Sequence, residues 1–219
     1  MDPIAAFMKK EQKEKLDRYR ILNEFARKGQ ILFTGSSLME QFPIHELLMD
    51  EGMDCLIYNR GIGGFTTDDM LKNMQEQIYG TEPSKIFINI GTNDMGKPDY
   101  TLERLIENYK KVLEQIKEQL PETEVYMMAY YPVNEVDKKA VLPDAEWVKH
   151  MFDNRNNANI RLANQAVKQL AETMGYHYID VNEGLYDENG RLKKEFTLEG
   201  VHMYANGYRV VLRNMKKYL

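Results

Sequence analysis

The sequence has few of the features that stabilise secreted domains or hold a chain in a membrane. It contains a single cysteine among 219 residues, so no internal disulfide can form, and Cys55 is interpreted as a small buried hydrophobe. No stretch approaches the roughly 18 apolar residues of a membrane-spanning helix. The first residues place charge after a short apolar stretch, the reverse of a secretory signal. We therefore expect a cytoplasmic protein without stable membrane insertion.

The chain also lacks an excess of positive charge and a metal-binding pattern of histidines. Its formal net charge is −5, which gives no basic footprint for nucleic acid. The histidines are His45, His150, His177 and His202, and none shows a ligand spacing such as His-Glu-x-x-His. We expect no metal, no other cofactor and no nucleic-acid partner.

What is present fits one globular domain with a helical extension. Hydrophobic residues make up 43% and charged residues 29% of the chain, as in ordinary folded proteins. Residues 1–28 are expected to form an N-terminal helical extension and residues 29–219 a single domain. The extension would cover the domain or form a homodimer contact, and its charges between Lys9 and Lys15 would face water. Gly29 is a plausible helix stop, and the predicted apolar stripe comprises Leu16, Tyr19, Ile21, Leu22 and Phe25.

Short apolar runs alternate with helical periodicity along the domain. Near-continuous apolar runs are typical of strands buried on both faces, and here they occupy residues 31–34, 55–58, 86–90, 125–130 and 177–180. Helical spacing covers residues 102–116, 160–170 and 208–219, with Gly175 as a stop and Asn206 as a cap. This alternation predicts an α/β fold, a three-layer α/β/α sandwich with about five parallel strands. An irregular stretch over residues 131–157, with Pro132, Pro143 and Trp147, is a candidate binding or lid segment.

Polar and glycine-rich segments follow the predicted strands, where an open parallel sheet binds its ligands. Gly-Ser-Ser-Leu at 35–38 follows the first strand, and Asn-Arg-Gly-Ile-Gly-Gly at 59–64 follows the second. Gly-Thr-Asn-Asp at 91–94 follows the third, and Glu-Gly-Val-His at 199–202 precedes the last helix. Each segment alone is more often a turn or a cap than a site. Together, in this order and at strand ends, they indicate chemistry.

Acyl transfer needs the groups that these segments offer. A serine hydroxyl becomes a nucleophile when a base removes its proton, and histidine can do so near neutral pH. A carboxylate fixes the imidazole tautomer, and backbone or amide N–H groups hold the oxyanion.

These residues resemble the four blocks of the SGNH hydrolase family, the GDSL-like lipases and acylhydrolases, in its bacterial platelet-activating-factor-acetylhydrolase-like branch. The resemblance spans about residues 30–219 and implies a flavodoxin-like α/β/α sandwich. It implies Ser37 as nucleophile, His202 as base and Glu199 as acid. It also implies an oxyanion hole of the Ser37 and Gly64 amides and the Asn93 side chain.

Two positions depart from the family pattern. Ser36 stands where the family has aspartate before the nucleophile, and we expect its hydroxyl to hydrogen-bond locally. Glu199 replaces the family aspartate, so a longer side chain must fold back to reach His202, which other hydrolases tolerate.

The resemblance implies a serine esterase acting on a small-molecule carboxylic ester, with acetyl as the first acyl group to test. A carbohydrate deacetylase, a lysophospholipase or thioesterase, and a catalytically decayed binding module remain alternatives. Side chains that either line an acyl pocket or belong to the core are Phe65, Tyr131, Pro132, Val133 and Val201.

Overall fold

A five-stranded parallel sheet forms the centre of the molecule. The computed structural model describes residues 3–136 and 150–219. The strand order is β2-β1-β3-β4-β5, and all pairs are parallel, which confirms the predicted flavodoxin-like sheet of about five parallel strands. The strands are β1 (Ile31–Gly35), β2 (Ile57–Asn59), β3 (Lys85–Asn89), β4 (Glu124–Met128) and β5 (His177–Ile179).

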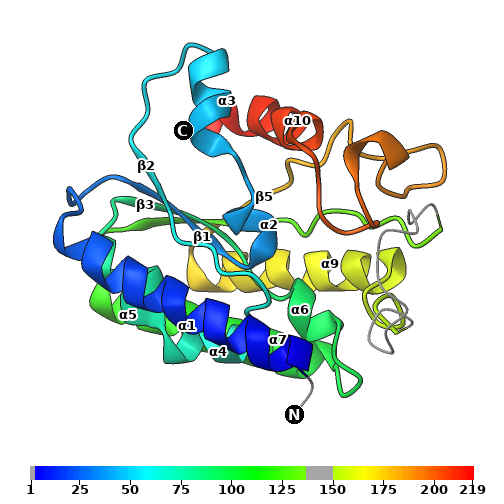
Figure 1. Cartoon of the computed structure of the whole chain (residues 1–219), viewed down its shortest axis with the longest axis horizontal. Helices are drawn as coiled ribbons and strands as arrows, with labels where there is room; N and C mark the ends of the chain where they lie inside the picture. The colour runs from blue at the N-terminus through cyan, green and yellow to red at the C-terminus, as the bar shows by residue number, and fades with distance from the viewer. Residues whose placement is uncertain (1–2, 137–149) are drawn as a thin grey trace.

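Helices cover both faces of this sheet and complete the three-layer sandwich (Figure 1). One layer contains α1 (Pro3–Glu24), α4 (Thr67–Lys72), α5 (Met74–Gln77), α7 (Leu102–Gln119) and α9 (Asn157–Met174). The opposite layer contains α2 (Ser37–Glu40), α3 (Ile44–Asp50) and α10 (Ala205–Met215). Short elements are α6 (Thr92–Met95) and the 3₁₀ turns η1 (Tyr79–Thr81), η2 (Lys194–Phe196) and η3 (Lys216–Tyr218).

Alternate residues of each strand feed two separate apolar cores. Leu32 of β1 and Ile86 of β3 are fully buried in the core beneath α4, α7 and α9. Their neighbours Phe33 and Phe87 point to the other face, where their rings lie 5.2 Å apart in a tilted arrangement beneath α2, α3 and α10. The near-continuous apolar runs of the sequence arise because successive side chains point to opposite faces and both faces are covered.

The long helices begin and end at recognisable residues. Thr101 accepts a hydrogen bond from the Arg104 amide at the start of α7, and Asn156 caps α9 in the same way. Gly175 ends α9 in the left-handed conformation (φ +76°), as its sequence predicts. The cap predicted for Asn206 is wrong. That residue lies inside the first turn of α10, and its side chain donates to the Glu195 carbonyl.

The N-terminal helix is shorter than predicted and its apolar face is narrower. It ends at Glu24, four residues before the predicted end at residue 28. Leu16 and Tyr19 pack on the core, whereas Ile21, Leu22 and Phe25 are 58%, 50% and 78% exposed, so the predicted stripe is wrong in its second half. The main helical neighbours of α1 are the short elements α5 and η1, which are too small to cover its whole apolar face.

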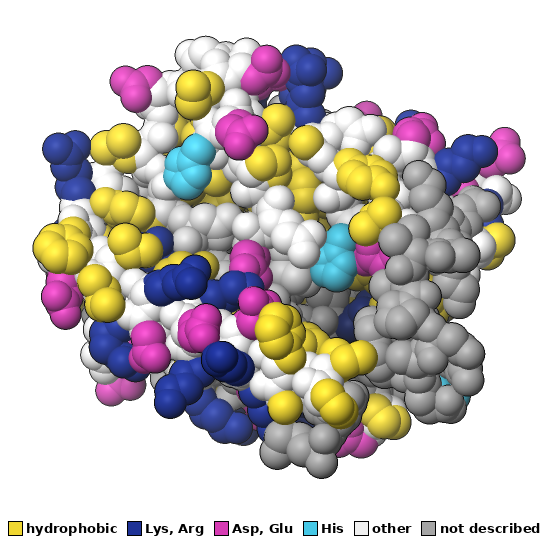
Figure 2. Space-filling model, in the orientation of Figure 1, with side chains coloured by type: hydrophobic (Ala, Val, Ile, Leu, Met, Phe, Trp, Pro, Cys, Tyr) yellow, Lys and Arg dark blue, Asp and Glu magenta, His cyan; other side chains and the backbone are white. Residues whose placement is uncertain are grey.

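Charges of both signs alternate over the outer surface of α1 (Figure 2). Lys10 pairs with Glu14, and Arg20 pairs with Asp17 and Glu76. This mixture matches a solvated face. Cys55 differs from its prediction, because it is only partly buried at the margin of the second core.

The predicted lid segment lies partly outside the described residues. Pro143 and Trp147 of the irregular stretch lie outside the described residues, so the lid interpretation stays a prediction. Within residues 3–136 and 150–219, no helix is long and apolar enough to cross a membrane.

Gly35 is a position where the fold needs glycine. It closes β1 with φ +148°, and a Cβ there would lie 2.0 Å from the backbone oxygen of Asn89. We expect Gly35→Ala to prevent stable folding, because backbone on the neighbouring strand cannot yield. Gly29→Ala is the matched control: it shares a positive φ (+74°) but meets open space, so we expect a loss of about 1 kcal/mol. Circular dichroism and urea unfolding measure both, and equal stability of the two variants would contradict the prediction.

Candidate active site

The predicted site residues gather at the carboxyl ends of the strands, around the point where the strand order reverses. The chain leaves β1 toward β2 on one side, and β3 pairs with β1 on the other. Connections from β1 and β3 therefore run in opposite directions and leave a crevice between them. Ser37 follows β1 and Asn93 follows β3, so both residues lie at this crevice.

Ser37 is the first residue of α2, immediately after the Gly35–Ser36 turn. The hydroxyl of Tyr208 on α10 donates to the Leu38 carbonyl at 2.8 Å and anchors this short helix. The local hydrogen bond expected for the Ser36 hydroxyl is wrong. Its Oγ is fully buried without a partner among the described residues, while its amide donates to Asn89.

Ser37, His202 and Glu199 form one hydrogen-bonded chain. His202 Nε2 lies 2.9 Å from Ser37 Oγ, although 165 residues separate the two in the sequence. On the other side of the ring, Nδ1 contacts Oε1 of Glu199. A carboxylate partner makes Nδ1 the protonated nitrogen, which leaves Nε2 free to accept the Ser37 proton.

Glu199 reaches His202 by folding back within a tight turn. The same Oε1 also accepts the His202 backbone N–H at 2.8 Å. Thr197 Oγ1 closes the turn by accepting the Gly200 N–H and donating to the His202 carbonyl. Gly200 has φ +99°, and a Cβ there would lie 2.1 Å from the Asn134 carbonyl oxygen. The Glu199 carboxylate thus accepts hydrogen bonds from both the backbone N–H and the ring Nδ1 of His202.

Contacts with His202 keep Glu199 ionised. Burial raises the pKa of its carboxyl, but hydrogen bonds from the His202 ring and backbone and the charge of a protonated His202 outweigh burial. The net pKa lies below the ordinary value for glutamate.

The predicted oxyanion groups lie in the loops after β2 and β3. Gly64 has φ +77°, and its N–H has no acceptor among residues 3–136 and 150–219. A Cβ on the preceding Gly63 would lie 3.8 Å from the Cβ of Ser37, so this loop borders the nucleophile. Asn93 Nδ2 donates to the Phe65 carbonyl at 3.0 Å, which joins the two loops.

Arg155 holds Asn93 in place and was missed by sequence reasoning. Its Nη2 donates to Asn93 Oδ1 at 3.1 Å, and its Nε donates to the Thr92 carbonyl at 2.8 Å. The first bond fixes which end of the amide is the donor, so Nδ2 faces the other way. Burial lowers the pKa of Arg155 to about 10, an effect opposed by the charge of Glu199, and the guanidinium stays cationic at neutral pH. No motif marks this residue.

The N-terminal helix also contacts the site, which the sequence did not predict. Gln12 Nε2 donates to the Gly63 carbonyl at 2.8 Å, and the Tyr19 hydroxyl donates to Gly61 at 2.7 Å. Lys15 pairs with Glu40, whose carboxylate accepts the Gly63 N–H at 2.6 Å. Residues from α1 and α2 therefore hold the loop that carries Gly64.

The five side chains considered for an acyl pocket are all buried: Phe65, Tyr131, Pro132, Val133 and Val201. Phe65, Val133 and Val201 belong to the core beneath α4, α7 and α9, and Tyr131 belongs to the opposite core. Burial agrees with both interpretations, so the acyl pocket stays a prediction. Within the part of the chain that the structure describes, no three His, Cys, Asp or Glu side chains gather as metal ligands.

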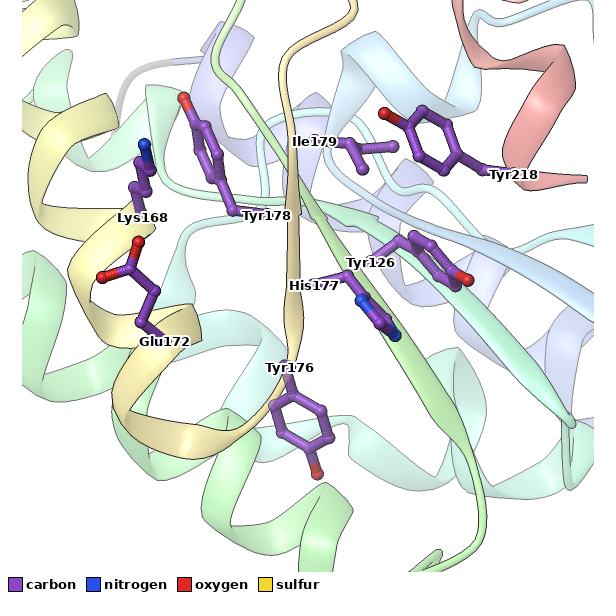
Figure 3. Close-up of a pocket in the computed structure, with 8 residues that line it drawn as sticks. All are labelled: Tyr126, Lys168, Glu172, Tyr176, His177, Tyr178, Ile179 and Tyr218. Carbon is purple, nitrogen blue, oxygen red and sulfur yellow. The ribbon is translucent and has the colours of Figure 1, made fainter.

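An open hollow of about 470 Å³ lies elsewhere, beside edge strand β5 (Figure 3). Tyr126 and His177 stack along the sheet, while Lys168 and Glu172 approach from α9. Because the hollow holds neither Ser37 nor His202, it is separate from the site at the strand ends.

Comparison with known proteins identifies the family. The model of the GDSL-like lipase/acylhydrolase family matches residues 44–210. This chain belongs to that family. It is accordingly a carboxylic ester hydrolase by family, and the SGNH resemblance is confirmed. The matched region contains the blocks of Gly64, Asn93 and His202 and begins after Ser37.

The chain also resembles individual relatives and solved structures. A structure from Streptococcus pneumonia, described as a candidate platelet activating factor protein, is 33% identical, with a TM-score of 0.85 over 98% of this chain and 95% of its own. An acetyl xylan esterase shares the fold at 17% identity and a TM-score of 0.67, covering 86% and 98% of the two chains. The N-acylneuraminate cytidylyltransferase of Escherichia coli O18:K1:H7 is 24% identical over 213 residues, which are 92% of this chain and 45% of the relative. The chain thus spans about half the length of that curated relative.

Removing Arg155 tests its contacts. We expect Arg155→Met to lower the free energy of unfolding by about 2 kcal/mol, because a buried acceptor on Thr92 and a partly buried one on Asn93 lose a charged donor. The ester hydrolysis rate should fall as well, because the Asn93 amide can then turn. Arg161→Met is the control, since Arg161 is exposed on α9. Urea unfolding and ester hydrolysis measure the two effects, and a variant matching the control in both would contradict the assignment.

Proposed function

We propose that this protein hydrolyses short-chain carboxylic esters through an acyl-enzyme on Ser37. The observation that carries the proposal is the continuous hydrogen-bonded path from Ser37 Oγ through His202 to Glu199. Such a path delivers a proton from the nucleophile to a base and stabilises the base once it is charged.

The reaction has two halves. Ser37 Oγ attacks the ester carbonyl carbon while its proton passes to His202 Nε2, and a tetrahedral oxyanion forms. Collapse breaks the bond to the alcohol oxygen, which takes the proton from His202. Water then attacks the acyl-enzyme, its proton passes to His202, and collapse releases the acid and returns the proton to Ser37.

Three donors serve the oxyanion in this proposal. The Ser37 N–H begins α2 and so has no acceptor within its helix. The Gly64 N–H is unpaired in the described structure, and Asn93 Nδ2 is directed by Arg155. Preorganised donors of this kind stabilise charge that develops in the transition state.

We propose that the ester substrate carries a small acyl group such as acetyl. The apolar side chains around the strand ends are buried within the cores, which favours a short acyl group over a long chain. Acetylated sugars are the second candidate class, favoured by the fold shared with an acetyl xylan esterase and by the relative named for N-acylneuraminate. We also propose a cytoplasmic location and a homodimer. Light scattering on a chain lacking residues 1–28 tests whether the N-terminal helix forms the dimer contact.

Replacing the nucleophile decides between an enzyme and a binding module. We expect Ser37→Ala to lower p-nitrophenyl acetate turnover to the buffer rate and to abolish fluorophosphonate labelling, since no other group takes the acyl chain. Ser84→Ala is the control, because the Ser84 hydroxyl donates to the Gly29 carbonyl on the surface, away from Ser37. Turnover that does not depend on Ser37 would refute the mechanism. Acetate release from acetylated saccharides, simple esters and lysophospholipids then ranks the substrate classes.

The proposed role of Glu199 as the acid of the triad can be tested separately. We expect Glu199→Gln to lower kcat roughly 10²–10⁴-fold, because a neutral amide cannot stabilise the imidazolium. The pKa of Glu199 is lowered by folding, so its carboxylate stabilises the native state above its unfolded pKa of about 4.3. That contribution is lost as pH falls through the lower folded pKa. The stability difference between wild type and variant should therefore hold at neutral pH and shrink below about pH 4. A difference independent of pH would contradict the assignment.

A further inference from the structure

The loop that carries Gly64 is held from outside by two elements. Its beginning is tied to β1, since the Arg60 amide donates to Phe33 and the Ile62 amide donates to Gly35. Its end contains two consecutive glycines, Gly63 and Gly64, in a turn closed by the Phe65 amide, which donates to the Ile62 carbonyl at 3.2 Å. Such a turn admits two orientations of its central peptide, so a further contact is needed to select the direction of the Gly64 N–H.

Gln12 of α1 hydrogen-bonds the peptide group between Gly63 and Gly64. The Gly63 carbonyl and the Gly64 N–H belong to one peptide unit, which is planar and trans, so the two groups point in opposite directions. Gln12 Nε2 donates to that carbonyl at 2.8 Å. The bond fixes the plane and leaves the Gly64 N–H pointing away from α1. A carbonyl that accepts a hydrogen bond also polarises its own N–H and makes it a stronger donor.

Glu40 of α2 holds the preceding peptide unit. Its Oε2 accepts the Gly63 N–H at 2.6 Å, and Lys15 Nζ lies 2.5 Å from its Oε1. The Lys15 and Glu40 side chains are 29% and 24% exposed, so solvent screens this pair only in part. Because Glu40 lies three residues after Ser37, the same contact ties the loop to the helix of the nucleophile.

The ends of two α1 side chains pack directly against Gly64. A Cβ there would lie 2.8 Å from Gln12 Nε2 and 3.0 Å from Met8 Cε. Gln12 is partly buried, whereas its neighbours Glu11 and Lys13 are exposed. The contact is thus specific to one face of the helix.

We propose that Gln12, supported by the Lys15–Glu40 pair, is a positioning residue that sets the Gly63–Gly64 peptide so that the Gly64 N–H receives the oxyanion. This inference rests on the proposed esterase function. It makes α1 part of the catalytic unit, although Gln12 touches neither the substrate nor the reacting atoms.

The position of Gln12 determines which kinetic parameter must change. The oxyanion exists in the transition state and not in the bound ester, so loss of its alignment lowers kcat and leaves KM in place. The Ser37–His202–Glu199 path contains no residue of α1, so the pH dependence of kcat/KM should not move.

The experiment uses the full chain with p-nitrophenyl acetate as substrate and phenylboronic acid as inhibitor. In the adduct, Ser37 Oγ bonds to boron and its proton passes to His202, which leaves a boronate whose oxygen needs the oxyanion donors. Gln12→Met keeps the side-chain length and removes the donor. We expect kcat to fall about tenfold and boronate inhibition to weaken in parallel, which is less than the roughly 10²–10³-fold loss of an oxyanion donor itself.

Two further variants make the result specific. Gln12→Lys restores an N–H donor and should recover most of the kcat. Lys13→Gln changes an exposed neighbour on the same helix turn and should behave as wild type. Thermal midpoints of all variants report that the fold is intact.

The outcomes separate this inference from the function beneath it. A wild type without Ser37-dependent turnover would refute the esterase function and the inference together. A working wild type whose Gln12→Met variant keeps its kcat, or changes only KM, would overturn the role of Gln12 and leave the esterase intact. A lower kcat with unchanged boronate inhibition would also overturn it.

Discussion

The parallel pairing of β1 with β3 is the constraint on which the site depends. Gly35 lies opposite Asn89 at the end of this pairing, so both strands finish at the same level. The absence of a side chain at Gly35 lets the two backbones approach at the point where the chain turns into α2. Ser37 and the loop of Asn93 consequently emerge side by side. The Glu199–His202 turn has only to reach this one place, which it does from the segment between β5 and α10.

Local patterns in the sequence predict much of this arrangement. The apolar runs predicted all five strands, most clearly the central β1 and β3, which are covered on both faces. Ser37, Gly64, Asn93 and His202 stood out because family blocks follow strand ends. Helix ends were less predictable where tertiary contacts replace a local cap. Asn206 resembles an N-cap in sequence, yet its amide bonds Glu195 from within the helix.

Long-range contacts had no signal in the sequence. Arg155 and Gln12 act on loops 62 and 51 residues away, and neither belongs to a motif or a periodic stripe. The stripe predicted on α1 was half wrong for the same reason: which part of a helix is covered depends on the element that it crosses. Ser36 was expected to bond locally because serine often does so in turns, but here its side chain points into the packed interior.

The hydrogen bond between Ser37 and His202 also has a consequence for the order of events during synthesis. Ser37 and His202 are 165 residues apart, so His202 is synthesised long after Ser37. Contacts between distant residues form late because the intervening chain must first be closed into a loop. A growing chain would therefore carry Ser37 without a partner until those 165 residues have been made. Under the proposed mechanism, activity can appear only when the Glu199–His202 turn has docked beside Ser37.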